Sequence, residues 1–303
     1  MMSNKTHDPP FKNEILIHAE IAAKGNVFDL YGGDASYGVL LLNEYPELHY
    51  WYFDIDESAL ETATQRLSVF GQRAHVKKCN ARDLDKRISE EGLREIDLAI
   101  YDPGLRLGHV ENPERGFLAK WSGPLDGRYD QRQQMTIADV LNGESVDVLT
   151  DIFNKVEMPF PRRLAEAIVN HRKSGRITTS SELKEIVSKA IPFKARRKKV
   201  PPEIIAMLAL RIFVNDELGA LSEAVSKGFK VLKPGGRLLT ISYHSGEARI
   251  YKEFARKFDE RYAADDERRL RVLTKKALKP STEEIRDNPL IRSAQFRAYE
   301  KLN

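Results

Sequence analysis

The chain has very little cysteine and no long hydrophobic run, and each absence restricts what the protein can be. Its 303 residues include one cysteine, Cys79, which excludes an intrachain disulfide and a zinc site built from several cysteines. No apolar run approaches the roughly 20 residues of a transmembrane helix. The opening stretch MMSNKTHDPPFKNE lacks the apolar core of a secretion signal. We therefore expect a cytoplasmic protein without a membrane partner, and we expect no metal site.

The chain also has only a small excess of positive over negative charge. The formal net charge of +4 permits an anionic partner without requiring one. Hydrophobic residues make up 41% of the chain and charged residues 31%, which is typical of a soluble globular protein. A chain of this length has room for one large domain or two smaller ones.

The first hundred residues alternate strand-like and helix-like segments. Four apolar stretches are each followed by a polar or glycine turn and then by a helix-like pattern or a break; they read NVFDLY, HYWYFDID, AHVKKCN and IDLAIYD. This rhythm predicts a parallel sheet with helices on both faces, and right-handed connections would make it doubly wound.

The rhythm stops near Gly108 and resumes after Pro201. The stretch between them reads as loops and short amphipathic helices, one capped near Ser180, and it ends beside the basic run KARRKK (194–199). A long helix is then predicted from about Pro202 to Leu232, followed by the strand RLLTISYH, a helix and two last strands. We therefore predict a discontinuous domain, 1–107 with 202–303, and an inserted helical domain over 108–201.

Polar residues follow four of the predicted strands, where parallel sheets bind their ligands. Gly32 and Gly33 follow the first strand and allow a close approach to the backbone. Asp54 ends the second strand and is placed to accept hydrogen bonds from a ribose. Asn80 follows the third strand and Asp102 the fourth, where the reaction would take place.

Two cofactors suit this layout, a dinucleotide and S-adenosylmethionine. The loop GGDASYG does not contain the G-x-G-x-x-G pattern of dinucleotide sites, which disfavours the first. S-adenosylmethionine needs an anion near its ammonium group, which Asp29 supplies, and a ribose acid. Each feature alone also has a structural interpretation: Gly-Gly as a turn, a strand-end aspartate as a helix cap, His244 as a hydrogen-bonded core side chain, and KARRKK as a solvated face.

Long stretches of the chain resemble one family. The sequence is similar to the S-adenosylmethionine-dependent methyltransferases of the MraW, or ribosomal small-subunit methyltransferase H, family, which modify N4 of a cytidine in small-subunit ribosomal RNA. The stretches that carry the resemblance, in order, are HDPPFKNEI, NPERGFLAKWSGPLDGRYDQ, LRIFVNDELGALSEAV, LKPGGRLLTISYHSGEARIYK and NPLIRSAQFR.

The resemblance implies a Rossmann-like methyltransferase sheet with an inserted helical domain for substrate recognition. It also implies S-adenosylmethionine as cofactor and small-subunit ribosomal RNA as partner, while a monomer and a homodimer both stay open. Asp102 is the expected catalytic residue. The expected cofactor contacts are Asp29, Gly32, Gly33, Ala35, Ser36, Tyr37, Asp54, Asn80, Asp102 and His109. The expected RNA contacts are Lys194, Arg196, Arg197, Lys198, Lys199, His244 and Arg249.

The chain departs from the family pattern at several polar positions. Tyr37 stands where the family has a histidine, and His109 stands where it has a glutamine. Before the long helix, a histidine, threonine, arginine and glutamine of the family are replaced by Pro201, Ile204, Ile205 and Leu208. These replacements leave two alternatives beside the ribosomal RNA enzyme: a related protein that binds RNA or ribosomal particles without catalysis, and a methyltransferase for another nucleic acid or a protein.

Overall fold

The chain forms two compact units. A computed structural model describes residues 9–120, 122–196, 200–264 and 269–302. The first unit combines Met1–Gly104 with Gly219–Asn303, and the second is Leu105–Leu218. Each unit has a hydrophobic core of its own.

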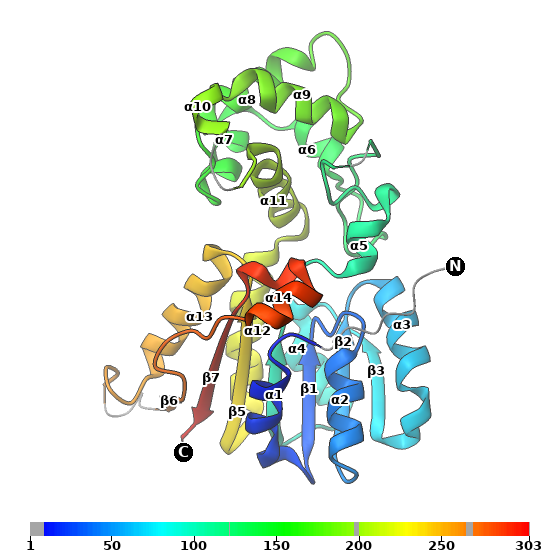
Figure 1. Ribbon diagram of the computed structural model, residues 1–303, viewed down its shortest axis with the longest axis vertical. Helices are drawn as coiled ribbons and strands as arrows, with labels where there is room; N and C mark the ends of the chain where they lie inside the picture. The colour runs from blue at the N-terminus through cyan, green and yellow to red at the C-terminus, as the bar shows by residue number, and fades with distance from the viewer. Residues whose placement is uncertain (1–8, 121, 197–199, 265–268, 303) are drawn as a thin grey trace. The chain divides into compact units, whose positions relative to one another are not determined.

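The first unit is built on one seven-stranded sheet in the order β3-β2-β1-β4-β5-β7-β6 (Figure 1). The pairs among β1 to β5 are parallel, and β7 runs antiparallel to both β5 and β6. The strands are β1 (Asn26–Leu30), β2 (His49–Asp54), β3 (Ala74–Lys78), β4 (Ile96–Tyr101), β5 (Leu232–Ser242), β6 (Leu270–Val272) and β7 (Gln295–Lys301). The order reverses between β1 and β4, which is the point where such sheets bind ligands.

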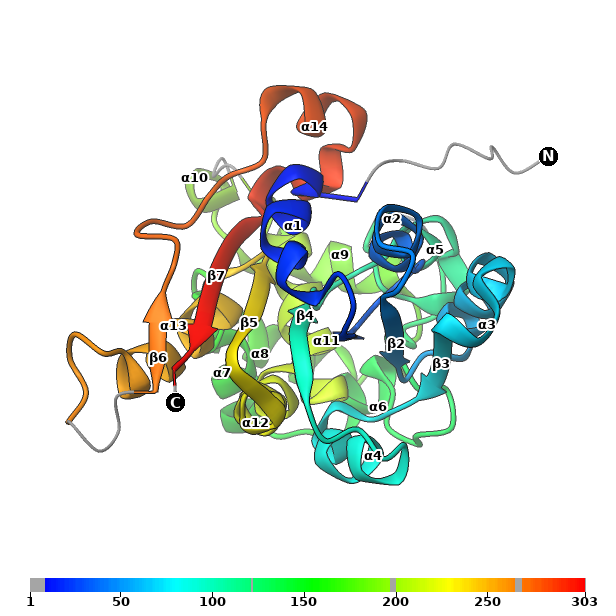
Figure 2. The same cartoon turned by 90° about the horizontal axis from the view of Figure 1, so that it is seen from below.

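Helices cover both faces of this sheet, as the view along the strands shows (Figure 2). One face packs against α1 (Lys12–Ala19), α2 (Ser36–Glu44) and α3 (Glu57–Leu67). The other packs against α4 (Leu84–Glu90), α12 (Glu217–Val231) and α13 (Ser245–Phe258). The short α14 (Thr282–Asp287) precedes β7. The central strands β1 and β4 are almost wholly buried because side chains on both faces meet a helical layer.

The predicted parallel order of the first strands and the two predicted last strands are confirmed, but the ends of the sheet differ from the sequence prediction. Sequence KPGG correctly marks the end of α12 at Val231, yet β5 starts at once, at Leu232. Residues 233–236 form an irregularity opposite Asp97, whose carboxylate pairs with Lys233. The stretch predicted as a long sixth strand contributes only three residues, Leu270–Val272.

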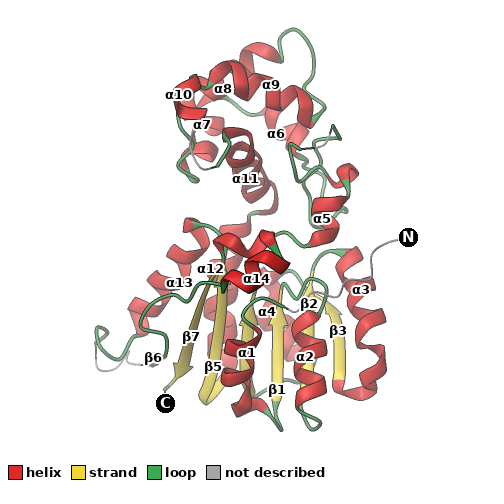
Figure 3. Ribbon diagram, in the orientation of Figure 1, coloured by secondary structure: helices red, strands yellow, loops and turns green. Residues whose placement is uncertain are grey.

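The second unit is helical, and its described residues contain no strand (Figure 3). Its helices are α5 (Leu107–Glu111), α6 (Ile137–Gly143), α7 (Val146–Asn154), α8 (Pro161–His171), α9 (Ser180–Ala190), α10 (Phe193–Arg196) and α11 (Pro202–Asn215). Thr179, and not Ser180, is the N-cap of α9: its hydroxyl accepts from the Glu182 amide, and Glu182 accepts from the Thr179 amide in return.

The single long helix expected over 202–232 is wrong, because the chain breaks at Asp216. This residue has a left-handed backbone, with φ of 48°, and ends α11 before α12 begins at Glu217. A buried ion pair spans the break, with Arg211 Nε 2.7 Å from Glu217 Oε1. The apolar side of α11, including Met207 and Leu210, packs in the core of the helical unit. That unit therefore reaches to Leu218, beyond the predicted boundary at 201.

The packing of α12 on the sheet makes one glycine irreplaceable. A Cβ atom at Gly228 would lie 2.0 Å from the Tyr101 hydroxyl and 2.8 Å from the Phe28 ring. We expect Gly228→Ala to lower the free energy of unfolding by about 1–3 kcal/mol through overpacking. Gly143→Ala, where a Cβ meets nothing within 4 Å, is the matched control. Chemical denaturation followed by circular dichroism measures both, and equal stability of the two variants would contradict this account of the packing.

Candidate active site

The catalytic candidate Asp102 lies directly after the most central strand. All six residues of β4 are buried, and Pro103 follows Asp102 and ends the strand. Gly104 then turns the chain with φ of 139°, a backbone that favours glycine. The alternation of the strand and this Pro-Gly turn fix Asp102 at the carboxyl edge of the sheet.

Two tyrosines hold the Asp102 carboxylate. Tyr37, in the first turn of α2, places its hydroxyl 3.2 Å from Asp102 Oδ2. The Tyr243 hydroxyl, from the turn after β5, also faces the carboxylate and acts to lower its pKa. The other oxygen, Oδ1, is buried and accepts no hydrogen bond from the residues that the structure describes. Burial raises the pKa of Asp102 to about 7, although both tyrosine hydroxyls act to lower it.

Asp29 is a second buried carboxylate, inside β1. It is wholly buried, and the Tyr50 hydroxyl of β2 donates to its Oδ2 through a short hydrogen bond. Oδ1 of Asp29 is buried and has no hydrogen-bond partner among the described residues. Burial raises the pKa of Asp29 well above its usual range, and the nearby charges of Asp102, Asp54 and Asp34 raise it further.

The loop between β1 and α2 is conformationally strained. Tyr31, Gly33 and Ala35 have φ values of 68°, 56° and 61°, and only one of them is glycine. A left-handed backbone costs a residue other than glycine on the order of 1 kcal/mol, and residues with this strain are often found at functional sites. Gly32 is required for a different reason: a Cβ there would lie 2.5 Å from the Tyr52 ring. Tyr52 therefore approaches the Gly32 backbone closely, and the close approach of a ligand there stays a prediction.

Ser36 hydrogen-bonds within its own turn, and its expected contact with a cofactor stays a prediction. Its amide donates to Asp34 Oδ1 at 3.2 Å and its hydroxyl to the same oxygen at 2.7 Å. Arg66 of α3 pairs with Asp34 Oδ2 at 2.7 Å. The first amide of α2 is thus already satisfied by Asp34, and an anion at this helix end would have to compete with it.

The structure separates Asp54 from its neighbour Asp56. Asp56 caps α3, since its carboxylate accepts from the Ser58 amide. Asp54 instead faces the strained loop: its Oδ2 lies 3.4 Å from the Gly33 amide nitrogen and 3.4 Å from the Tyr52 hydroxyl. Asn80 is exposed and caps the short turn after β3 by accepting from the Arg82 amide.

This edge of the sheet suits a cationic ligand. Asp102, Asp54 and Asp34 are close enough to raise the pKa of Asp29. Asp29 and Asp102 each keep a buried oxygen without a partner among the described residues. S-adenosylmethionine has two positive centres, a sulfonium and an ammonium, and a ribose diol. The residues present therefore fit it: Asp29 and Asp102 for the charged part, and Asp54 for the diol.

His109 is buried in the helical unit, in a ring cluster. Its imidazole centroid lies 4.5 Å from that of Phe117 and 5.2 Å from that of Tyr129, and Phe117 stacks on Tyr129. The Arg106 amide donates to His109 Nδ1 at 3.4 Å. Within its unit His109 is thus a packed side chain, and its expected contact with a cofactor stays a prediction.

The predicted RNA contacts are distributed over several elements. His244 caps α13, with Nδ1 accepting from the Gly246 amide, while Glu247 accepts from the His244 and Tyr243 amides. Arg249 and Lys194 are exposed. Arg196 ends α10, and Arg197, Lys198 and Lys199 lie outside the described residues. His244 therefore has the structural role that its position after an apolar strand also allowed.

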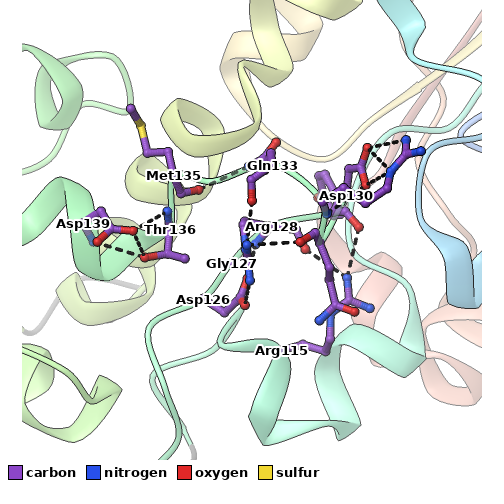
Figure 4. A network of polar contacts seen from close by, with 12 residues as sticks. Arg115, Asp126, Gly127, Arg128, Asp130, Gln133, Met135, Thr136 and Asp139 are labelled. Carbon is purple, nitrogen blue, oxygen red and sulfur yellow. Dashed lines mark hydrogen bonds and ion pairs between the residues drawn. The ribbon is translucent and has the colours of Figure 1, made fainter.

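Sequence reasoning left Asn215 without a role, and the structure supplies one. Its side-chain oxygen accepts from the Tyr129 amide at 2.8 Å, and its nitrogen donates to the Gly127 carbonyl at 2.7 Å. The same loop is braced by the Arg128 guanidinium on Asp126 and by Arg115, which donates to the Arg128 carbonyl (Figure 4). The network connects residues 126–133 of the loop before α6 to the end of α11.

The residues that sequence reasoning missed are tyrosines. Tyr50 and Tyr243 reach Asp29 and Asp102 from other elements. Tyr50 and Tyr52 had a usable signal, since they alternate on the same strand face as Asp54, toward α2. Tyr243 had none beyond its place next to a strand end.

None of the helices that the structure describes has the length and apolar content needed to cross a membrane. The sequence model of the MraW methylase family matches residues 4–302. Three relatives, each called Ribosomal RNA small subunit methyltransferase H, are similar over 98% of this chain. They come from Carboxydothermus hydrogenoformans (36% identity, 98% of that protein), Persephonella marina (35%, 99%) and a Cyanothece species (34%, 95%).

The sheet order with an antiparallel β7, and the acidic edge at β1, β2 and β4, define a Rossmann-like, S-adenosylmethionine-dependent methyltransferase. Within that class the chain belongs to the MraW methylase family. The resemblance seen in its motifs is confirmed over nearly the whole length.

Because the pKa of Asp102 is raised in the folded protein, the contribution of Asp102 to the free energy of unfolding should depend on pH. A group whose pKa rises on folding stabilises the fold below its unfolded pKa, near 4, and loses that contribution as pH rises through about 7. We expect Asp102→Asn to stabilise the unliganded protein by about 1–3 kcal/mol at pH 8, with the gain shrinking steadily toward pH 4. Urea denaturation across this range measures it. A gain that does not change with pH would show that Asp102 does not carry this cost.

Proposed function

We propose that this protein transfers a methyl group to the N4 amino group of a cytidine in small-subunit ribosomal RNA, with Asp102 orienting the amine. The observation that carries the proposal is the buried Oδ1 of Asp102 at the carboxyl end of β4, which has no hydrogen-bond partner in the part of the chain that the structure describes. The family membership supports the substrate, since the relatives are named for small-subunit ribosomal RNA. A cytoplasmic site of action and the subunit count stay predictions.

The chemistry of the amine explains why an acceptor is needed. The lone pair of an exocyclic amino group is delocalised into the base, so the nitrogen is a weak nucleophile. Hydrogen bonds from its two hydrogens to a carboxylate and a carbonyl return electron density to the nitrogen. Asp102 Oδ1 is free to accept one of them, and its pKa of about 7 lets it also take up the proton that the reaction releases.

The cofactor roles follow from the same edge of the sheet. S-adenosylmethionine supplies the methyl group when bound. Asp29 would face its positive charge, Asp54 its ribose, and the strained Gly33–Ala35 turn its amino-acid part. Gly32 is the residue that lets Tyr52 close the wall beside this turn. The base must leave its stack to reach such a site.

Tyr37 supports an active enzyme over a protein that has lost the reaction. It stands where the family has a histidine, and such a replacement can remove catalysis. The structure instead places its hydroxyl on the carboxylate that the reaction needs. His109 and Leu208 replace two glutamines of the family. His109 is buried in the helical unit, and Leu208 is partly buried on α11.

The decisive experiment uses labelled S-adenosylmethionine and small subunits from cells lacking this modification. The RNA is then digested and its nucleosides are identified. We expect label on N4-methylated cytidine. Label on another nucleoside would move the function to a different RNA methyltransferase. No label, from protein shown by calorimetry to bind the cofactor, would support the non-catalytic alternative.

Asp102→Asn tests the role of the carboxylate in the same assay. The amide keeps the size of the side chain and loses the charge and the proton acceptor. We expect turnover to fall by about 100-fold or more, as for a lost general base, with the cofactor dissociation constant changed by less than about tenfold. A variant that retains most of its turnover would remove Asp102 from catalysis.

The helical unit offers a surface for RNA phosphates. A hollow of about 350 Å³ is lined by Asn142, Arg172, Lys173 and Arg176. Arg172 is used structurally, since it donates to the Leu141 and Glu144 carbonyls at the end of α6. Lys173 and Arg176 are exposed, and their charges can meet phosphates together with the basic run that begins at Lys194.

We expect Lys173→Ala and Arg176→Ala together to weaken binding of every RNA sequence. Each lost phosphate contact should lower the slope of log affinity against log salt by about 1. Arg163→Ala, which removes one exposed arginine of α8 outside the hollow, is the control for the loss of a surface charge elsewhere in the helical unit. Filter binding at several salt concentrations gives the slopes, and unchanged slopes in the double variant would exclude this surface.

A further inference from the structure

The Tyr37 hydroxyl has two acceptors and one hydrogen. It lies 3.2 Å from Asp102 Oδ2 and 3.2 Å from the carbonyl oxygen of Pro10. A phenol donates one hydrogen bond at a time. The two bonds therefore compete, and the state of Asp102 decides between them. An ionised carboxylate is the stronger acceptor, and a protonated one is weaker than an amide carbonyl.

We propose that Tyr37 is a positioning residue for the methyl transfer, whose hydroxyl hydrogen lies on Asp102 before the reaction and turns to the Pro10 carbonyl when Asp102 accepts a proton. This inference rests on the proposed function. In that reaction the amine nitrogen forms a bond to the methyl carbon, and the pair of the broken carbon–sulfur bond stays on sulfur. The amine proton passes to Asp102 Oδ1 and later to solvent.

The surroundings of Asp102 explain why a hydroxyl is suited to this task. Among the described residues, the other charged or titratable groups that face it are Asp29, Asp34, Glu247, Tyr243 and Tyr251. None of these is a cation, so the negative charge of Asp102 is stabilised by hydroxyl groups. A hydroxyl can also stay bonded after the charge is gone, because Pro10 offers the second acceptor. The Tyr37 hydroxyl therefore has a hydrogen-bond acceptor both when Asp102 is ionised and when it is protonated.

The inference gives the segment before α1 a role in the reaction. Pro10 precedes Phe11, which is buried with a left-handed backbone of φ 56°. The Phe11 amide donates to Glu284 Oε1 of α14 at 2.7 Å. The Pro10 carbonyl is therefore held in place from the far end of the chain, and Tyr37 joins that anchored segment to the end of β4.

The test is the pH dependence of single-turnover methylation by the full chain with small subunits. The ionised form of Asp102 is the active one, so the rate rises with pH through its pKa. Tyr37→Phe removes a hydrogen bond that favours ionisation. We expect the acid limb to move to higher pH by about half a unit or more, with the rate at high pH lowered less than about tenfold.

Tyr45→Phe is the matched control. The Tyr45 hydroxyl also donates to a backbone carbonyl, that of Leu16 in α1 at 3.2 Å, and it hydrogen-bonds no carboxylate of the described residues. We expect no movement of its acid limb. Tyr243→Phe should move the limb in the same direction as Tyr37→Phe, which keeps the test valid if the latter does not fold.

Three results overturn the inference. One is a Tyr37→Phe rate that is lower by the same factor at every pH, as for a purely structural residue. Another is an unmoved limb in a folded Tyr243→Phe when Tyr37→Phe cannot be made. The third is the absence of methylation by the unmutated protein, which refutes the proposed reaction itself. When the unmutated enzyme is active, either of the first two results refutes the role of Tyr37 alone.

Discussion

Negative charge buried against hydroxyl groups is the constraint on which the site depends. Asp29 and Asp102 lie inside or directly after the central strands, and the described residues that hydrogen-bond their carboxylates are tyrosines. Hydroxyls satisfy part of a carboxylate and cannot neutralise it. Each carboxylate keeps a buried oxygen without a partner among the described residues. The folded protein therefore carries an electrostatic cost, which a cationic ligand and an amine substrate would relieve under the proposed function.

The rest of the sheet unit keeps these carboxylates dry and in place. Helices on both faces bury β1 and β4, so the two aspartates cannot move to water. The strained turn from Tyr31 to Ala35 and the contact of Gly32 with Tyr52 shape the wall beside them. The strained turn lowers the stability of the fold, and the large hydrophobic cores of the unit offset this cost.

The helical unit is stabilised by different means. Its core is apolar, and its long loop is held by Asn215 and by paired arginines and aspartates of the loop itself (Figure 4). The family motif around Asn215 thus has a structural explanation. The basic hollow near Lys173 is partly structural as well, because Arg172 holds the end of α6 and Arg176 pairs with Asp139 at 2.8 Å. Lys173 is exposed and hydrogen-bonds only to the neighbouring Asn170 among the described residues.

The sequence by itself determined the parallel order of β1 to β4, the helical insert, and the strand-end positions of Asp54 and Asp102, because alternation and turn residues are local signals. The sequence did not predict the break at Asp216, because Arg211 and Glu217 pair only once both helices are packed. The partners of the carboxylates escaped it as well: Tyr37 is 65 positions from Asp102 in the chain. Only tertiary structure decides such pairs, because a side-chain hydrogen bond depends on which elements pack together and leaves no periodic trace in the sequence.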